Sequence, residues 1–135
     1  METLTIGRLA ERGGVNLETV RYYEREGLMP PPPRNPSGHR TYSPSAVRRL
    51  RFIRRCQELG FSLYEIKELL ALRSDPEQPC AEVIRQIDGK TAEVERRIAQ
   101  LRTIHRALRR LQDSCEGACH VSDCPILESL DTEIA

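Results

Sequence analysis

Residues 84–108, IRQIDGKTAEVERRIAQLRTIHRAL, carry the strongest periodic pattern in the chain. Their apolar positions recur at alternating spacings of three and four, which is the heptad pattern of a coiled coil. One core position of the heptad holds Ile84, Thr91, Ile98 and His105, and the other holds Ile87, Val94, Leu101 and Leu108. We therefore expect a single helix over residues 80–114, about 50 Å long at a rise of 1.5 Å per residue, that pairs with a second copy of the chain.

The residues before this helix predict a head made of short helices. The segment TIGRLAERGGVNLETVRYYEREGL, residues 5–28, holds helical stretches at 5–12 and 17–26 around a pair of glycines. Thr5 and Asn16 are favourable N-caps for the two stretches, and Glu24 is expected on the outer side of the second one. Two short helices joined by a glycine turn predict a helix-turn-helix, in which the second helix reads DNA.

The next segment, residues 29–43, contains the proline run Pro30–Pro33 and cannot be helical. A turn signal at residues 36–38 predicts a small hairpin, or wing, whose returning strand is residues 39–42. Ser43 then opens a third helix that runs to about residue 59. Ser62 opens a fourth, over residues 63–72, in which Glu65 completes a capping box.

Charge is divided unevenly along the 135-residue chain. Residues 1–60 contain 11 Lys and Arg against 6 Asp and Glu, whereas residues 61–135 contain 10 against 14. The basic first part predicts a polyanionic partner.

No apolar run approaches the roughly 18 residues of a membrane span, and the first residues lack the pattern of a signal peptide. We therefore expect no membrane partner and a cytoplasmic location.

Three residues of the second helix, Arg21, Tyr22 and Arg25, share its exposed side. Arginine binds guanine edges or phosphates, and a tyrosine hydroxyl donates to phosphate, so we interpret these residues as DNA contacts. Arg40 and Tyr42 of the wing are candidates for the same role. The third helix extends the basic surface with Arg48, Arg49, Arg51, Arg54 and Arg55. The alternative for these charges is a solvated face or pairing with acidic residues.

Four of the five cysteines lie at the two ends of the long helix, with Cys80 at its start and Cys115, Cys119 and Cys124 after its end. In a chain whose thiols stay reduced, such groups indicate metal or redox chemistry. The ends of one helix are too far apart to share an ion, but an antiparallel partner brings its own helix start beside this chain's loop. We therefore predict a metal site formed by Cys80 of the partner chain and by the loop of this chain, which offers Cys115, Cys119, His120 and Cys124.

The ligand types restrict the ion. Three thiolates suit trigonal Hg(II) or Pb(II), and a fourth ligand completes a tetrahedron for Zn(II) or Cd(II).

Cys56, far from the other cysteines, is interpreted as a buried apolar residue, and His105 as a structural residue of the coiled-coil core. A metal-dependent hydrolase would need a general base and a pocket. Glu116 is the one candidate base in the loop, so we do not expect an enzyme.

Together these elements predict a mainly α fold, in which a winged helix-turn-helix head is joined to a long antiparallel coiled-coil dimerisation helix. We expect four segments: the DNA-binding domain with its following helix pair at 1–73, a linker at 74–79, the dimerisation helix at 80–114, and a metal-binding loop with a short last helix at 115–135.

Three segments together resemble the MerR family of bacterial transcriptional regulators: residues 5–28, the wing segment SGHRTYS at 37–43, and RRLRFIRRCQELGFSLYEIKELL at 48–70. The resemblance implies a homodimer bound to a promoter palindrome. It implies that Arg21, Tyr22, Arg40 and Tyr42 contact the DNA. It also implies that metal binding reshapes the dimer and that the DNA is bent and untwisted. RNA polymerase can then engage two promoter elements that are otherwise too far apart and misphased.

Within that family, Cys80, Cys115 and Cys124, followed by Pro125, resemble the three ligands of the mercury-responsive members, so Hg(II) is the effector we expect first. Zinc-responsive relatives also carry extra Cys and His in this loop, which keeps Zn(II), Cd(II) and Pb(II) as alternatives. Those relatives usually have two adjacent cysteines where this chain has Cys115-Glu116. Redox-sensing relatives hold an iron–sulfur cluster on four loop cysteines, and with three in this loop such a cluster would also need the partner's Cys80.

Overall fold

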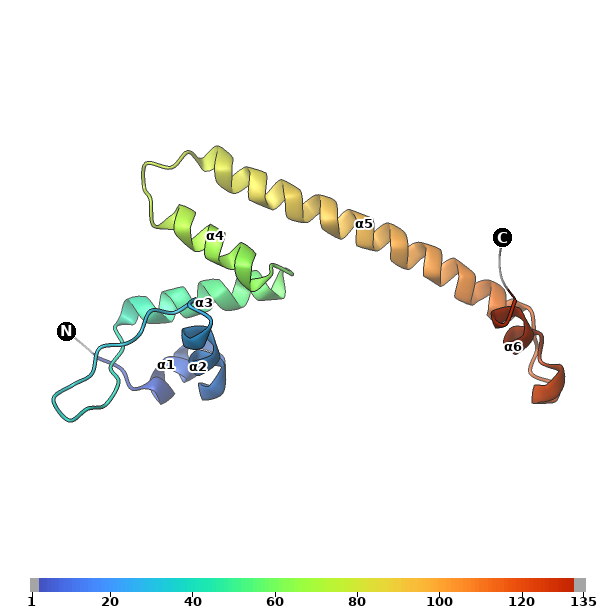
Figure 1. Ribbon diagram of the computed structural model, residues 1–135, viewed down its shortest axis with the longest axis horizontal. Helices are drawn as coiled ribbons and strands as arrows, with labels where there is room; N and C mark the ends of the chain where they lie inside the picture. The colour runs from blue at the N-terminus through green and yellow to red at the C-terminus, as the bar shows by residue number, and fades with distance from the viewer. Residues whose placement is uncertain (1–2, 133–135) are drawn as a thin grey trace. The chain divides into compact units, whose positions relative to one another are not determined.

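The computed structural model describes residues 3–132, and the secondary structure of this part of the chain is helical (Figure 1). The elements are α1 (Ile6–Gly13), α2 (Leu17–Arg25), α3 (Pro44–Glu58), α4 (Leu63–Arg73), α5 (Cys80–Asp113), the 3-10 helix η1 (Val121–Asp123) and α6 (Pro125–Leu130). This confirms the mainly α fold and each predicted helix to within a residue or two at its ends. The sequence pattern did not predict η1.

The chain divides into two compact units, Met1–Ile87 and Asp88–Ala135, and each is described by itself. The finer division into four segments stays a prediction, and its first two and last three residues lie outside the described part. No helix within residues 3–132 has the length and apolar character that a membrane span requires.

The helix-turn-helix at the start of the first unit is set by local capping. Thr5 Oγ1 accepts a hydrogen bond from the Arg8 N–H at 3.2 Å, and Asn16 Oδ1 accepts one from the Thr19 N–H at 2.8 Å. Between the helices Gly14 has a φ of 72°, a left-handed conformation that glycine adopts without strain. The predicted N-caps are therefore confirmed.

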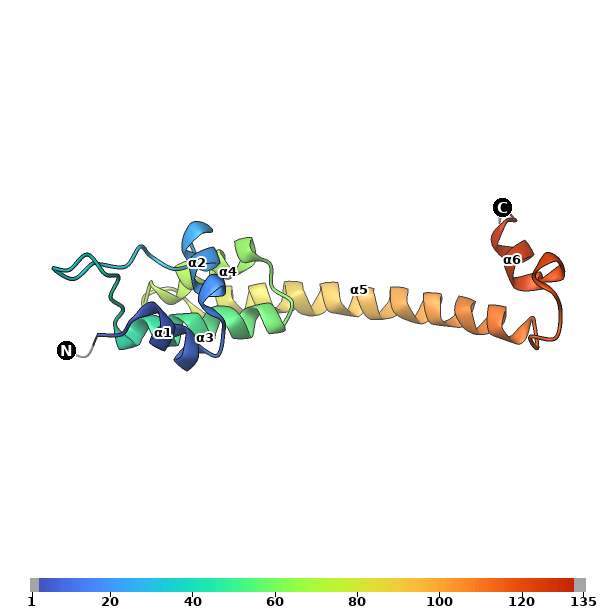
Figure 2. The same ribbon diagram turned by 90° about the horizontal axis from the view of Figure 1, so that it is seen from below.

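Helix α3 packs against both α1 and α4 and supplies much of the core of the first unit (Figures 1 and 2). The capping box of α4 forms as predicted, because the Ser62 N–H donates to Glu65 Oε1 and the Glu65 N–H donates to Ser62 Oγ. Cys56 is buried, as predicted, and burial raises the pKa of its thiol. The largest fully buried side chains are Leu9, Val20, Leu28, Met29, Leu50, Ile53 and Ile66.

The wing is less regular than the predicted hairpin. Residues 29–43 form a loop that projects from the helices (Figure 1) and is closed by two isolated bridges, Leu4–Tyr42 and Arg34–Arg40. The Thr41 N–H donates to the Pro33 carbonyl at 2.9 Å. Proline has no N–H to donate, so the proline-rich side of the loop cannot complete a strand ladder. The expected returning strand is therefore reduced to single bridges.

Helix α5 is continuous over 34 residues, as the heptad pattern predicts. Lys90 is the one residue of this helix that is buried within the chain. Exposed apolar side chains follow the heptad stripe: Ile84, Ile87, Val94, Ile98, Leu101 and Leu108, with Ile104 beside it. The helix thus has the apolar face that the predicted coiled coil requires, while the pairing and its direction stay predictions.

Gly13 marks a close approach of α1 to α3, and this contact gives a test of the packing. A Cβ added at Gly13 would lie 2.2 Å from Cδ2 of Leu50, a fully buried side chain with little room to move. We expect Gly13→Ala to lower the free energy of unfolding by about 1–3 kcal/mol, the usual cost of overpacking. Urea denaturation followed by circular dichroism at one fixed protein concentration measures this change.

Gly7→Ala is the matched control in the same helix. Gly7 is exposed, and a Cβ there would meet nothing nearer than Thr5 Oγ1 at 4.0 Å. Because alanine favours the helix over glycine by up to about 1 kcal/mol, this variant should be as stable as the parent or more so. Equal destabilisation by the two substitutions would show that the contact with Leu50 is not tight.

Candidate DNA-binding surface and metal centre

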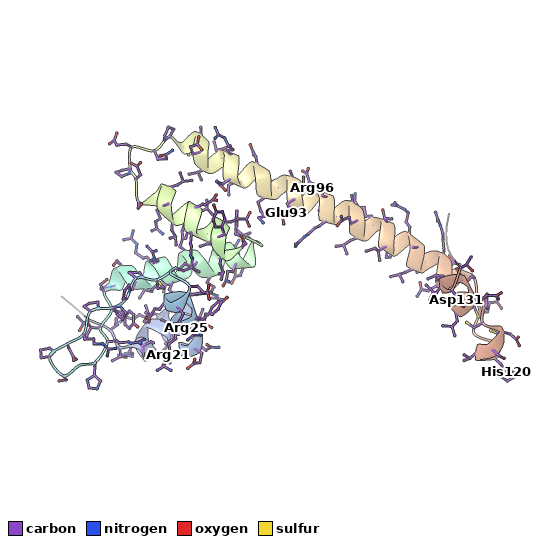
Figure 3. The ribbon with its side chains drawn as sticks, viewed as in Figure 1. Arg21, Arg25, Glu93, Arg96, His120 and Asp131 are labelled. Carbon is purple, nitrogen blue, oxygen red and sulfur yellow. The ribbon has the colours of Figure 1, made fainter. Side chains whose placement is uncertain are left out.

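The predicted recognition residues lie on the solvent side of α2. Arg21, Tyr22 and Arg25 are all exposed, and Figure 3 shows Arg21 and Arg25 projecting from this helix. Arg21 Nη1 lies 2.8 Å from Glu18 Oε1, in an ion pair whose two side chains are both exposed. Such pairs contribute little to stability, so Arg21 can exchange this partner for a base edge or a phosphate of DNA at small cost.

The wing residues Arg40 and Tyr42 meet a shared partner inside the first unit. The Tyr42 hydroxyl donates to Glu24 Oε1 at 2.5 Å, and Arg40 Nη1 donates to Glu24 Oε2 at 2.9 Å. Tyr42 is 4% exposed. In this structure its hydroxyl is engaged within the protein, whereas the Arg40 side chain keeps 37% of its surface exposed. A direct DNA contact by either residue stays a prediction.

Glu24 was expected on the outer side of α2, and that expectation is wrong. Its side chain is 11% exposed and joins the recognition helix to the wing through two hydrogen bonds. The pattern held a signal for this position, because Glu24 follows the buried Val20 by four residues and therefore shares its helical face. Its partners, 16 and 18 residues further along the chain, carried no such signal.

The environment of Tyr42 changes its acidity. Burial, followed by the hydrogen bond to Glu24, raises the pKa of Tyr42 to about 12 from the ordinary value of 10.0. The neutral phenol is therefore the form that the fold favours, and it is the form that donates to the Glu24 carboxylate.

Most arginines of α3 have partners within the first unit. Arg49 and Arg51 donate to backbone carbonyl groups, and Arg54 and Arg55 each pair with Glu58. Some of these arginines therefore already have partners within the protein, although the pairs of Arg54 and Arg55 with Glu58 are exposed and, like that of Arg21, can be exchanged for phosphate at small cost. This agrees with the alternative that some of these charges serve internal pairing.

Three cysteines come together in the loop between α5 and α6. The Sγ atoms of Cys115, Cys119 and Cys124 all lie within 4.8 Å of one another, and those of Cys115 and Cys119 are 3.5 Å apart. The chain turns at Gly117, whose φ is 84°, and the Gly117 N–H donates to Cys115 Sγ at 3.3 Å. The 3-10 helix η1 then leads directly to Cys124.

Hydrogen bonds shift the pKa values of the Cys115 and Cys119 thiols in opposite directions. The Gly117 N–H lowers the pKa of Cys115, because it stabilises the thiolate, and the contact with Cys119 acts in the same direction. The hydrogen bond to Cys115 raises the pKa of Cys119, since it favours the protonated form of that thiol. Cys115 is therefore the readier of the two to form the thiolate that a metal needs.

The donor set fits a thiophilic ion. Metal–sulfur bonds of about 2.3 Å place the sulfurs on one ion roughly 4 Å apart, close to the separations in this cluster. Three sulfurs without carboxylates favour soft or borderline ions over Mg²⁺ or Ca²⁺. Small side-chain rotations in this exposed loop suffice to bring the three thiolates onto one centre.

The remaining predicted ligands lie outside this group. Cys80 is the exposed first residue of α5, and its approach to the loop of a second chain stays a prediction. His120 follows Cys119 directly, yet the close ligand group found among residues 3–132 comprises the three cysteines alone. Figure 3 shows His120 at the end of the loop that lies away from α5.

A helix-turn-helix with an exposed basic second helix, followed by a long apolar-striped helix and a thiol cluster, is the architecture of a DNA-binding regulator. The profile of the MerR HTH family regulatory proteins matches residues 4–72, and that of the MerR DNA-binding region matches residues 47–111. The chain belongs to the MerR family.

Several family members are similar over nearly their whole length. The chain is 44% identical over 125 residues to the mercuric resistance operon regulatory protein of Bacillus cereus, covering 93% of this chain and 95% of that protein. PbrR691 of Ralstonia metallidurans CH34, solved in complex with lead(II), is 40% identical with a TM-score of 0.86, over 94% of this chain and 98% of that one. MerR of Bacillus megaterium MB1, solved with mercury(II), is 39% identical with a TM-score of 0.74, over 96% and 100%. By their names these relatives are regulatory proteins, which is the class of protein that the sequence predicts.

The link through Glu24 predicts a measurable loss of stability. We expect Glu24→Ala to lower the free energy of unfolding by about 1–3 kcal/mol, because the buried Tyr42 hydroxyl loses its acceptor. Glu26→Ala removes the same charge from an exposed position two residues further along and should change stability by less than about 0.5 kcal/mol. Chemical denaturation of the two variants side by side makes the comparison, and equal effects would show that Glu24 is not a structural link.

The raised pKa of Tyr42 predicts a pH dependence at the alkaline end. Because the folded-state pKa lies above the ordinary value, this contribution to stability is complete below pH 10.0 and is lost as the pH rises towards about 12. Tyr42→Phe should reduce the alkaline decline in the free energy of unfolding. Part of the decline should remain, because burial also raises the pKa of Tyr23. A decline as steep in the variant as in the parent would contradict the assignment.

Proposed function

We propose that this protein is a homodimeric transcriptional regulator that binds a promoter palindrome and activates transcription when a thiophilic ion binds at the loop after α5. The observation that carries the proposal is the convergence of three cysteine sulfurs within 4.8 Å in a chain with a MerR-family helix-turn-helix. Hg(II) is the effector we favour, with Zn(II), Cd(II) or Pb(II) as the alternative and iron–sulfur or thiol redox sensing as the third.

Two kinds of observation support a soft metal as the effector. The B. cereus relative regulates a mercuric resistance operon, and the two solved relatives are complexes with lead(II) and mercury(II). In this chain the loop offers sulfur ligands, which select such ions over hard cations.

In this proposal residues 1–73 form the DNA-binding domain, and residues 74–79 link it to the dimerisation helix at 80–114. Residues 115–135 form the metal-binding loop and the short last helix. The exposed apolar stripe of α5 pairs with that of an antiparallel second copy, so that the partner's Cys80 approaches Cys115 and Cys124. A bound ion joins several thiolates at once and thereby ties the loop to the partner. The two DNA-binding heads then move relative to each other, the promoter bends, and RNA polymerase engages both of its elements. A protein with this role works in the cytoplasm, where the bacterial chromosome lies.

The DNA-binding part of the proposal predicts a local effect at α2. Arg21→Ala should weaken binding to the cognate promoter by about 10–100-fold, the cost of one good contact to a base edge. Arg96→Ala removes the same charge from an exposed position of α5 outside the heptad core and should leave affinity within about twofold. Fluorescence anisotropy at one salt concentration measures both, and equal losses would indicate a general charge effect.

The dimer predicts a different response at the apolar stripe. Leu101→Asp places a charge at a heptad core position, where burial without a partner costs several kcal/mol. We expect sedimentation to show a monomer, and DNA affinity to fall with it. Gln100→Asp puts the same charge at a neighbouring exposed position and should stay dimeric. A Leu101→Asp protein that remains dimeric would rule out this helix face as the interface.

A metal site shared between two chains predicts that a substitution can abolish the metal response without changing the affinity for DNA. Cys80→Ser should abolish metal-dependent transcription in vitro while gel shifts show unchanged promoter affinity. In the parent protein, metal should change the DNA bend with little change in affinity. Ala81→Ser, at the next exposed position, is the control and should respond normally. Induction that survives in Cys80→Ser, or metal that simply releases the protein from DNA, would count against the mechanism.

A further inference from the structure

The cysteine cluster is complete within one chain. Its three sulfurs come from residues 115–124 of the same loop, and the shortest separation, 3.5 Å, joins Cys115 to Cys119 rather than to Cys124. The sequence pattern made Cys119 an additional candidate beside the two principal ligands of this loop, Cys115 and Cys124. In the structure the three cysteines are equivalent in position, because the Sγ atom of each lies within 4.8 Å of the other two.

We propose that Cys119 is a metal ligand, and that the loop of a single chain captures the ion on Cys115, Cys119 and Cys124 before the partner's Cys80 completes the site. This inference rests on the proposed function and deepens it. It names a residue that decides which ion is held, and it gives an order to the binding steps.

Capture by one loop follows from the short chain that joins the ligands. Cys115 and Cys124 are nine residues apart, so bringing the ligands together closes only a short loop, and the entropy cost of closing a loop rises with its length, although slowly. The reversal at Gly117 and the turn of η1 already hold the sulfurs near one another. Cys119 is exposed and Cys115 and Cys124 are half-exposed, so an incoming ion reaches all three from solvent.

The number of sulfurs sets the preference for the ion. Cys115 and Cys124 with the partner's Cys80 make a three-thiolate set, which suits trigonal Hg(II) or Pb(II). Adding Cys119 makes four thiolates, the tetrahedral set of Zn(II) and, by the same preference, Cd(II). Cys119 therefore extends the response to tetrahedral ions, while Hg(II) can still be held without it.

The experiment titrates Cd(II) into the reduced full-length protein and follows the sulfur-to-cadmium charge-transfer absorption, which grows with the number of Cd–S bonds. The proteins compared are the parent, Cys119→Ser, Cys80→Ser and the control Ser122→Ala, an exposed position of the same loop. Circular dichroism of each protein confirms that the variants keep their helices.

Cys119→Ser should lose about a quarter of the absorption per bound ion, one sulfur of four. Its Cd(II) affinity should fall by at least about tenfold, a loss typical even of residues that only support a ligand. Cys80→Ser should still bind one Cd(II) per loop with the absorption of three sulfurs. Ser122→Ala should match the parent. In transcription assays, Cys119→Ser should lose the response to Cd(II) and retain the response to Hg(II).

Two outcomes overturn the inference while leaving the proposed function intact: a Cys119→Ser protein with the parent's absorption and affinity, or a Cys80→Ser protein that binds no Cd(II). A parent protein that binds no Cd(II) in this titration, and no Hg(II), Zn(II) or Pb(II) in parallel titrations, overturns the proposed metal sensing itself. The two failures are therefore distinguishable.

Discussion

The exposed apolar stripe of α5 is the constraint on which the rest of this protein depends. The helix runs for 34 residues, yet Lys90 is its one residue buried within the chain. A helix with a continuous apolar face owes most of its stability to what covers that face. Because the stripe keeps heptad spacing, a second copy of the same helix fits it. In the proposed dimer, two DNA-binding heads and two thiol loops in one molecule follow from this single packing requirement.

Side chains rather than a strand ladder hold the wing of the DNA-binding head. The proline run removes backbone donors, and two isolated bridges remain. The carboxylate of Glu24 compensates by accepting from both Arg40 and Tyr42, so that the recognition helix and the wing share one buried polar link. The link is most sensitive to the loss of Glu24, because the buried Tyr42 hydroxyl then loses its acceptor, whereas the Arg40 side chain keeps 37% of its surface exposed to water.

The thiol loop has a different physical character from the head. Apolar residues of this region, Val121, Leu127 and Leu130, are exposed, so the loop has little core of its own. A segment with few buried contacts takes much of its order from the ligands it binds. Sulfur chemistry selects the class of ion, and the number of sulfurs that converge selects among ions of that class. The same loop can therefore serve both as the recognition element for the metal and as the part of the protein whose order the metal changes.

The sequence by itself determined the helices, their caps and the apolar stripe, because each depends on residues within a few positions of one another. Thr5, Asn16 and the Ser62–Glu65 box act locally, and heptad spacing is visible without a fold. It also indicated the proposed class of ligand, since cysteine sulfur prefers soft or borderline ions. Tertiary structure decided what distant residues do together. It turned Glu24 inward to meet Arg40 and Tyr42, and it brought the sulfur of Cys119 beside those of Cys115 and Cys124. Those outcomes depend on how the backbone brings separate segments into contact, and neither composition nor periodicity encodes that directly.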